Sequence, residues 1–466
     1  MKRRESGLSA WRLTMMALGT IIGGSFFLGS SIAVNAAGPG ALIAYVIGGA
    51  LVYCILFALS EMTVANPGSG SFRVFAAEAF GRGAGFVVGW VYWTGMVLAM
   101  SSEATAVAIL LREWIPNVQI ALVGGLIIAG VTLLNLLGAD KLSKLEGYLA
   151  GVKILALVLF IVLAAVLIAG KLTNGVQLPA AQQSAAPTAA GGLEGIAGSM
   201  LIIMFAYAGF EIIGLAACEA RNPKRTIPKA IRNTVFSIVG LYVLSIGVML
   251  PLIPAAGVEQ DVSPFVFALK IQGIEWAATA MNIVMITAIL STMLAAMFGI
   301  GRMMRSLADE GYAPVFLRDK KEVPYRGIIA SGIAMLLGLG IGMLLPRVYL
   351  FLISSGGFVM LFIYAVIMAT HIRFRKKNGC PPDGKCQLWG FPYTSAIVLV
   401  VLVLSIAGMP FVPGQEAGLI AGGVLVAFYT AVYLIGWARK HKGPPPIDSD
   451  KKPELKDCTE CKQCGR

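Results

Sequence analysis

The chain has 466 residues, of which 57% are hydrophobic and only 13% are charged, and its formal net charge is +13. Soluble proteins carry about 25% charged residues, so this composition excludes an ordinary soluble protein. The positive charge does not indicate nucleic acid binding, because the basic residues lie in short loops between apolar blocks, where they act as topology signals. The apolar residues fall into blocks of about 20, the length that crosses a bilayer.

These blocks predict an all-α integral membrane protein with about twelve transmembrane helices. The expected spans are 14–35, 41–64, 85–110, 119–137, 148–169, 195–217, 231–252, 276–301, 327–345, 348–371, 394–411 and 417–437. The basic start of the chain, Lys2, Arg3 and Arg4, followed by an apolar run, resembles a secretory signal peptide. Because many similar apolar spans follow, this run is interpreted as the first transmembrane helix. Residues 1–13 are expected to form a cytoplasmic N-terminus and 438–466 a flexible cytoplasmic tail around the transporter domain at 14–437.

The charged loops predict the orientation. Lys and Arg gather in the loops around 66–84, 219–230, 302–326 and 372–390, while the opposite loops hold few. The positive-inside rule therefore predicts a multi-pass protein of the cytoplasmic (cell) membrane with both termini in the cytoplasm.

The cysteines are then expected to be reduced. Cys380 and Cys386 lie in a basic loop and Cys458, Cys461 and Cys464 in the tail, both on the predicted cytoplasmic side. The tail spacing could bind zinc or an iron–sulfur cluster if a fourth ligand were supplied, and this is left open. No metal is expected in the transport core. We expect no cofactor either.

Two spans contain helix-breaking clusters, Gly19–Phe27 in the first and Phe205–Glu211 in the sixth. They are five spans apart and so cross the membrane in opposite directions, as expected for inverted repeats at about 14–169 and 195–371. Unwound backbone at this depth is tolerated only around a cavity, where its N–H and C=O groups can bind a substrate. The alternative is that these glycines are packing contacts between ordinary helices.

The first cluster resembles the glycine-rich first-helix signature of the amino acid–polyamine–organocation (APC) superfamily, and further segments resemble its bacterial amino acid permeases. These are Ala37–Gly40, Ala58–Met62, Asn66–Phe72, Ala79–Arg82, Gly89–Trp93, Asn222–Ala230 and Ser306–Pro314. The resemblance covers about residues 10 to 435. It implies the five-plus-five inverted-repeat fold with broken first and sixth helices and two extra helices at 394–437. Many relatives have a Gly-Thr-Gly core where this chain has Gly23-Gly24-Ser25, which moves the hydroxyl.

The broken helices predict the substrate site. The substrate carboxylate is expected to meet the backbone of Ile22, Gly23, Gly24 and Ser25. Carbonyls near Phe205 and Ala208 are expected to meet the amine. Phe205 and Tyr207 are candidate gates over the substrate, or packing residues.

Ionisable residues inside spans are costly and are therefore functional candidates. Lys153 resembles the lysine that stands where sodium-dependent relatives bind sodium, with Ser291 and Thr292 as hydroxyl partners; the alternative is a lysine snorkelling to the cytoplasmic surface. Glu211 is expected either to be proton-sensitive or to hold the broken sixth span together. Glu103 either faces the cavity, as a substrate-binding residue, or pairs with a buried group such as Lys153.

The predicted function is secondary active transport of an amino acid across the cytoplasmic membrane, with protons as the coupling ion. The alternatives are an amino acid exchanger, an amine carrier or, more distantly, a transporter-like sensor. No phosphate-binding loop or paired catalytic groups occur, so an enzyme is not expected. Which amino acid is carried, symport versus exchange, and the oligomeric state are not predicted. Glu61, at the cytoplasmic end of the second span, is expected to be structural.

Overall fold

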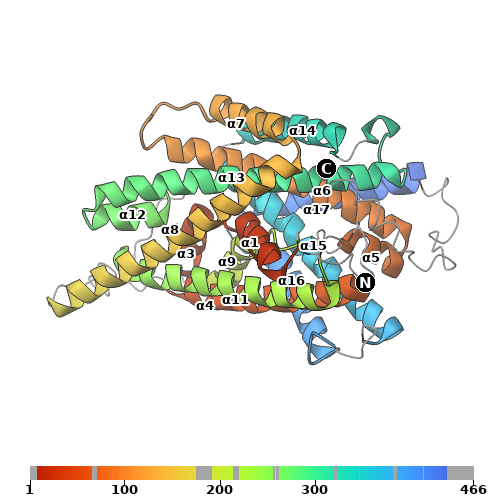
Figure 1. Cartoon of the computed structure of the whole chain (residues 1–466), viewed down its shortest axis with the longest axis horizontal. Coiled ribbons are helices and arrows are strands. Elements are labelled where there is room, and N and C mark those ends of the chain that lie inside the picture. The colour runs from red at the N-terminus through yellow and green to blue at the C-terminus, as the bar shows by residue number, and fades with distance from the viewer. Residues whose placement is uncertain are drawn as a thin grey trace.

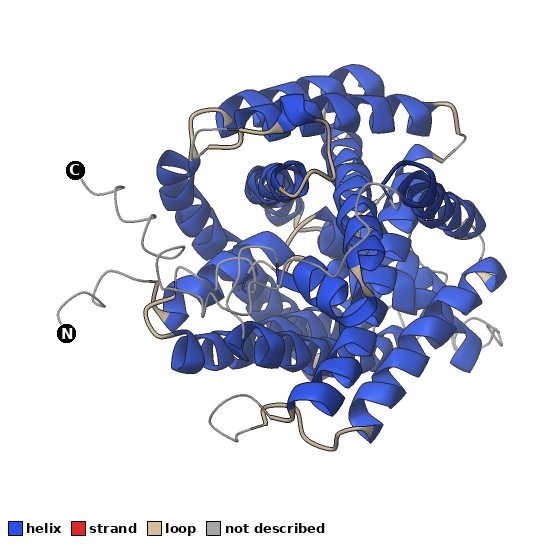
Figure 2. Cartoon of the chain, turned by 90° about the vertical axis from the view of Figure 1, so that its right-hand side faces the viewer, coloured by secondary structure: helices blue, strands red, loops and turns tan. Residues whose placement is uncertain are grey.

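The computed structural model describes residues 8–65, 71–174, 192–211, 213, 220–254, 258, 262–319, 323–345, 347–380, 386–412 and 414–437. The predicted tail at 438–466 with its three cysteines, the first seven residues and the loop at 175–191 lie outside them. Within this part of the chain the secondary structure is helical apart from one isolated β-bridge between Leu8 and Ala220 (Figure 2).

The α-helices are α1 (Ala10–Ile21), α2 (Gly24–Phe27), α3 (Gly29–Ala37), α4 (Gly40–Ala65), α5 (Ser71–Phe80), α6 (Arg82–Leu111), α7 (Ile120–Asn135), α8 (Ala139–Thr173), α9 (Leu193–Ala206), α11 (Pro223–Met249), α12 (Pro264–Ile271), α13 (Glu275–Asp309), α14 (Tyr325–Met343), α15 (Val348–Asn378), α16 (Tyr393–Gly408) and α17 (Glu416–Val432). Single turns of other helix types are η2 (Leu250–Leu252), η3 (Val315–Leu317), η4 (Met409–Phe411) and η5 (Tyr433–Trp437).

The number of spans can be compared with the prediction. Among the described residues, nine helices are long and apolar enough to cross a membrane, and the bent pair Ala10–Ile21 and Gly24–Ala37 makes a tenth. Two shorter apolar helices, Ile120–Asn135 and Glu194–Ala206, fall at the remaining predicted positions. The all-helical membrane class is therefore confirmed, while the count of twelve stays a prediction.

Several long helices, among them α4, α11 and α13, run along the long axis of the molecule, and α8 crosses it obliquely (Figure 1). α7 packs on α14 along one edge and α4 on α11 along the other, with α1 and α9 between them (Figure 1). α6 and α15 form the centre, because 83% of the apolar window of each is buried, against 11% for Glu416–Gly436. A Cβ at Gly95 of α6 would lie 2.2 Å from Val359 Cγ1 of α15, so glycine permits this close approach.

Side chains of α5 and α6 bind the segment at the end of α13 that resembles the permeases. Arg73 of α5 is fully buried and donates to Glu310 Oε2 at 2.8 Å and to Ser306 Oγ at 2.9 Å, at the end of α13. The Trp90 indole of α6 donates to the Tyr312 carbonyl at 3.0 Å. α5 lies at one end of the molecule and α12 at the other (Figure 1), so these contacts close one end of the bundle.

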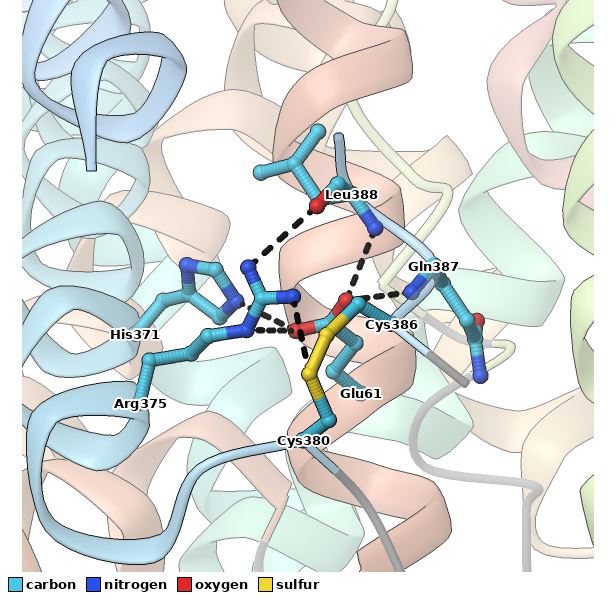
Figure 3. Close-up of a disulfide and its surroundings, with 7 residues drawn as sticks. All are labelled: Glu61, His371, Arg375, Cys380, Cys386, Gln387 and Leu388. Carbon is cyan, nitrogen blue, oxygen red and sulfur yellow. Dashed lines mark hydrogen bonds and ion pairs between the residues drawn. A yellow bond between two sulfur atoms is a disulfide. The ribbon is translucent and has the colours of Figure 1, made fainter. Parts of the chain in front are cut away.

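A second buried cluster ties α4 to the end of α15 (Figure 3). Glu61 Oε1 accepts hydrogen bonds from the backbone N–H groups of Gln387 and Leu388, at 2.5 and 2.7 Å. Its Oε2 lies 2.8 Å from His371 Nε2 and forms an ion pair with Arg375 Nε at 3.1 Å. Glu61 and His371 are fully buried, so this carboxylate holds two helices and a loop together.

The cysteines of this loop correct one expectation. The sequence predicts reduced thiols for Cys380 and Cys386, but the structure joins them in a disulfide beside Arg375 (Figure 3). Their Cα atoms lie 5.1 Å apart, within the range of about 4.4–6.8 Å that a disulfide requires. The prediction considered only the compartment and not this close approach of the two residues.

Candidate functional site

The first span is broken between α1 and α2. Ile22 is extended, with φ −75° and ψ 97°, and Gly23 is extended too, so the two halves of the span are bent by 54°. A Cβ at Gly23 would lie 3.2 Å from Thr292 Oγ1, and one at Gly24 would lie 2.6 Å from Glu103 Oε2. Glycine is needed here because side chains of α6 and α13 occupy the space.

The sixth span is broken after α9, and its break lies against the first. Gly209 has φ +111°, and a Cβ there would lie 3.0 Å from the Thr20 carbonyl oxygen. The Thr20 hydroxyl lies 3.2 Å from the Gly209 carbonyl oxygen. The Tyr242 hydroxyl of α11 lies within hydrogen-bonding distance of the carbonyls of both Ile21 and Ala206, at 3.3 and 3.1 Å. One tyrosine therefore bridges the two breaks.

A cavity opens between these breaks, α6 and α13. It is narrow, with about 50 Å³ of space that water can enter. Its lining is mostly apolar and contains six of the residues singled out from the sequence: Ser25, Glu103, Phe205, Ala208, Glu211 and Thr292. A mostly apolar lining with a few polar groups is typical of a small-molecule site.

Lys153 of α8 is bonded inward. Its side chain is 1% exposed, and Nζ donates to the Gly19 carbonyl at 2.6 Å and to Thr292 Oγ1 at 2.9 Å. Thr292 in turn lies 3.0 Å from the carbonyl oxygen of Ile22, at the break. Ser291 is buried next to Thr292 in α13. The lysine therefore joins α8, the end of α1 and α13, which is the place predicted for a substitute for sodium.

Glu103 of α6 occupies the backbone amides of the first break. Its Oε2 accepts from Gly24 N at 2.7 Å and its Oε1 from Ser25 N at 3.2 Å, and the residue is 3% exposed. Glu103 therefore lines the cavity, which is one of the alternatives left by the sequence, and its hydrogen bonds come from backbone amides. The charge of Lys153 also acts on this carboxylate, and pairing of the two side chains stays a prediction.

Glu211 stays within the sixth break. Its Oε2 accepts from Gly209 N at 3.0 Å, and its Oε1 accepts from the Tyr92 hydroxyl at 3.2 Å. Tyr92 was not singled out from the sequence, nor were Met96, Ala99 and Met100, which also line the cavity. Positions 92, 96, 99 or 100, and 103 follow one another at intervals of three or four residues, which places these side chains on one face of α6 and could have identified them.

The side chains of the two candidate gates, Phe205 and Tyr207, point to different places. Phe205 lines the cavity. Tyr207 is fully buried and points toward α4, where its hydroxyl donates to the Tyr45 carbonyl at 3.0 Å. Its ring packs on Tyr242 with the ring centroids 5.1 Å apart. The hydroxyl of Tyr207 is therefore used in helix packing.

The chain is similar to known amino acid permeases along nearly its whole length. A family model described as amino acid permease matches residues 12–442. The gamma-aminobutyric acid permease of Bacillus subtilis is 30% identical, over 94% of this chain and 96% of that protein. The corresponding permease of Escherichia coli is 32% identical, over 90% and 91%. An aromatic amino acid transport protein of Escherichia coli is 32% identical, over 94% and 96%.

A solved structure matches as well. The manganese transporter of Eremococcus coleocola aligns with a TM-score of 0.54 over 91% of this chain and 92% of that chain. The sequence identity is only 13%, so this likeness concerns the fold alone.

Proposed function

The chain belongs to the amino acid permease family, a family of multi-pass membrane transporters, and we propose that it carries an amino acid inward across the cell membrane together with protons. The observation that carries the proposal is the cavity between two broken helices, with backbone groups and two carboxylates around it. Such a cavity between repeats is the usual position of a transporter substrate site.

The substrate would lie across both breaks. Its carboxylate would take the amides of Gly24 and Ser25, and its ammonium the carbonyls near Phe205 and Ala208. The ring of Phe205 would cover it from the sixth span. Because relatives are named for gamma-aminobutyric acid and aromatic amino acids, these are the first substrates to test.

Coupling would depend on Lys153. When protonated, its ammonium is held by the Gly19 carbonyl and Thr292, as in the structure. When neutral, these contacts weaken and the helices can separate, so a proton shifts the balance between conformations. This supports transport that depends on pH but not on sodium. Glu211 is the alternative proton carrier, because it is buried at the other break.

The proposed orientation places both termini in the cytoplasm. The opposite positions of α5 and α12 agree with loops on opposite sides of the membrane (Figure 1). Single cysteines at 112–118 and 171–194 should be labelled from outside intact cells, whereas those at 302–326 should not. Labelling of 302–326 would overturn the orientation.

Uptake into proteoliposomes tests the transport proposal. We expect net uptake of gamma-aminobutyrate or an aromatic amino acid when a pH gradient is imposed, with no requirement for sodium. Counterflow without net uptake would instead identify an exchanger, and binding without flux a sensor. Lys153→Ala should lose gradient-driven accumulation more severely than substrate binding. Unchanged accumulation in this variant would make Glu211 the preferred proton carrier.

A further inference from the structure

The backbone amides proposed for the substrate carboxylate already hold a carboxylate. Glu103 accepts both Gly24 N, at 2.7 Å, and Ser25 N, at 3.2 Å. The contact leaves no spare room, since even a Cβ at Gly24 would lie 2.6 Å from Glu103 Oε2. A substrate carboxylate and Glu103 therefore compete for one pair of donors.

The charged groups around Glu103 decide whether it can stay ionised once a substrate carboxylate displaces it from the amides. Lys153 of α8 is the cation whose charge acts on it, and that ammonium is held by the Gly19 carbonyl and Thr292. The Tyr242 hydroxyl of α11 lies at the carbonyls of both breaks, and Glu211 of the sixth break lines the same cavity. A substrate carboxylate would add one more anion to this buried site, where like charges strongly disfavour joint ionisation.

We propose that Glu103 is an internal substitute for the substrate carboxylate, so that substrate binding requires Glu103 to leave the amides and take up a proton. This rests on the proposed function. A proton passes from solvent to one carboxylate oxygen of Glu103. The Gly24 and Ser25 N–H groups stop donating hydrogen bonds to Glu103 and donate them to the substrate carboxylate. No other bond changes. The amides are then never left without an acceptor, which avoids the cost of unpaired buried donors.

The arrangement also defines a substrate class. A molecule needs a carboxylate to replace Glu103 at the amides, so amines without one should bind poorly.

The proposed role of Glu103 also separates two proton-dependent steps. Glu103 acts when the substrate binds, whereas Lys153 acts when the helices move, so the first is measured by affinity and the second by accumulation.

Affinity measured at two pH values tests the proposal. The probe is gamma-aminobutyrate or, if the wild type does not bind it, the amino acid that gives the largest thermal shift in a screen, with 1-aminobutane as the amine without a carboxylate. For linked uptake of one proton, wild-type affinity should fall by up to about tenfold per pH unit between pH 6 and pH 8. Glu103→Gln should bind with less than a twofold change over this range, and more tightly than the wild type at pH 8.

Glu211→Gln is the matched control, because it neutralises the other carboxylate of the cavity without touching the amides. It should keep the wild-type dependence of affinity on pH. The inference is overturned if wild-type affinity does not depend on pH, or if Glu103→Gln keeps this dependence or weakens binding at both pH values. It is also overturned if Glu211→Gln removes the pH dependence of affinity as fully as Glu103→Gln does, or if 1-aminobutane binds as well as the amino acid. A wild type that binds no amino acid would instead overturn the proposed function.

Discussion

Glu61 and Glu103 are buried carboxylates that each accept two backbone N–H groups, yet their surroundings differ. Glu61 also contacts His371 and Arg375 directly, so its charge is fully matched by packed side chains (Figure 3). Glu103 faces a cavity, and Lys153 nearby is bonded to other acceptors. The comparison indicates that a carboxylate enclosed by its own partners fixes helices together, whereas one beside a cavity can exchange its amides with a ligand.

The largest expected effect concerns the enclosed carboxylate. Glu61→Gln removes the negative charge between His371 and Arg375 and leaves an uncompensated buried cation, which costs about 3–5 kcal/mol of stability. The apparent melting temperature in detergent should fall sharply, while substrate affinity of the folded fraction should stay within twofold. A stable Glu61→Gln protein with weakened substrate binding would reverse the roles assigned to the two carboxylates.

Filling the first break should remove binding. Gly24→Leu places a side chain where Glu103 and Ile289 now lie, so the substrate carboxylate loses its site. We expect affinity to fall by more than about a hundredfold, equivalent to about 2.7 kcal/mol. Circular dichroism and gel filtration check that the variant is folded. Normal affinity in the folded variant would place the site elsewhere.

A smaller effect is expected at the second break. Gly209→Ala forces a side chain into the positive-φ region and against the Thr20 carbonyl, at a cost of about 1–2 kcal/mol. This strain should move the two breaks apart, so substrate affinity should fall by about tenfold. Glycine-to-alanine substitution at Gly240, where a Cβ would meet no atom within 4 Å, is the control and should leave affinity unchanged. An equal loss of affinity on alanine substitution of Gly209 and of Gly240 would show that Gly209 has no specific role in the substrate site.

The smallest effect is expected at Tyr207. Tyr207→Phe removes only the hydrogen bond to the Tyr45 carbonyl, worth about 0.5–1.5 kcal/mol. Stability should fall slightly and the transport rate should stay within twofold, in contrast to Phe205→Ala, which uncovers the cavity. A tenfold loss of transport rate in Tyr207→Phe would give its hydroxyl a gating role.

Local sequence features predicted much of this arrangement. The apolar blocks predicted the membrane helices, and the glycine clusters predicted breaks at positions where α1 and α9 do end. The contact of Lys153 with Thr292 was anticipated from the family resemblance. These features depend on composition and short motifs, which are visible without knowledge of long-range contacts.

Contacts between distant residues could not be predicted in this way. Glu61 meets His371 across 310 positions in sequence and Leu388 across 327, and only the packed bundle brings them together. The hydrogen bond that Gly24 N donates to Glu103 depends on how α6 faces the break, and the spacing of residues left that open. The Cys380–Cys386 disulfide depends on how closely the two Cα atoms approach, at 5.1 Å, and not on compartment alone.

Infrared difference spectroscopy most directly tests the claim that Glu103 leaves the Gly24 and Ser25 amides and becomes protonated when substrate binds. Spectra of the purified protein are recorded at pH 7 with and without a bound amino acid. The account predicts that binding removes one carboxylate band and adds one protonated carboxyl band. This change should be absent in Glu103→Gln and retained in Glu211→Gln. Binding without a new protonated carboxyl band, or the same band in Glu103→Gln, would contradict it.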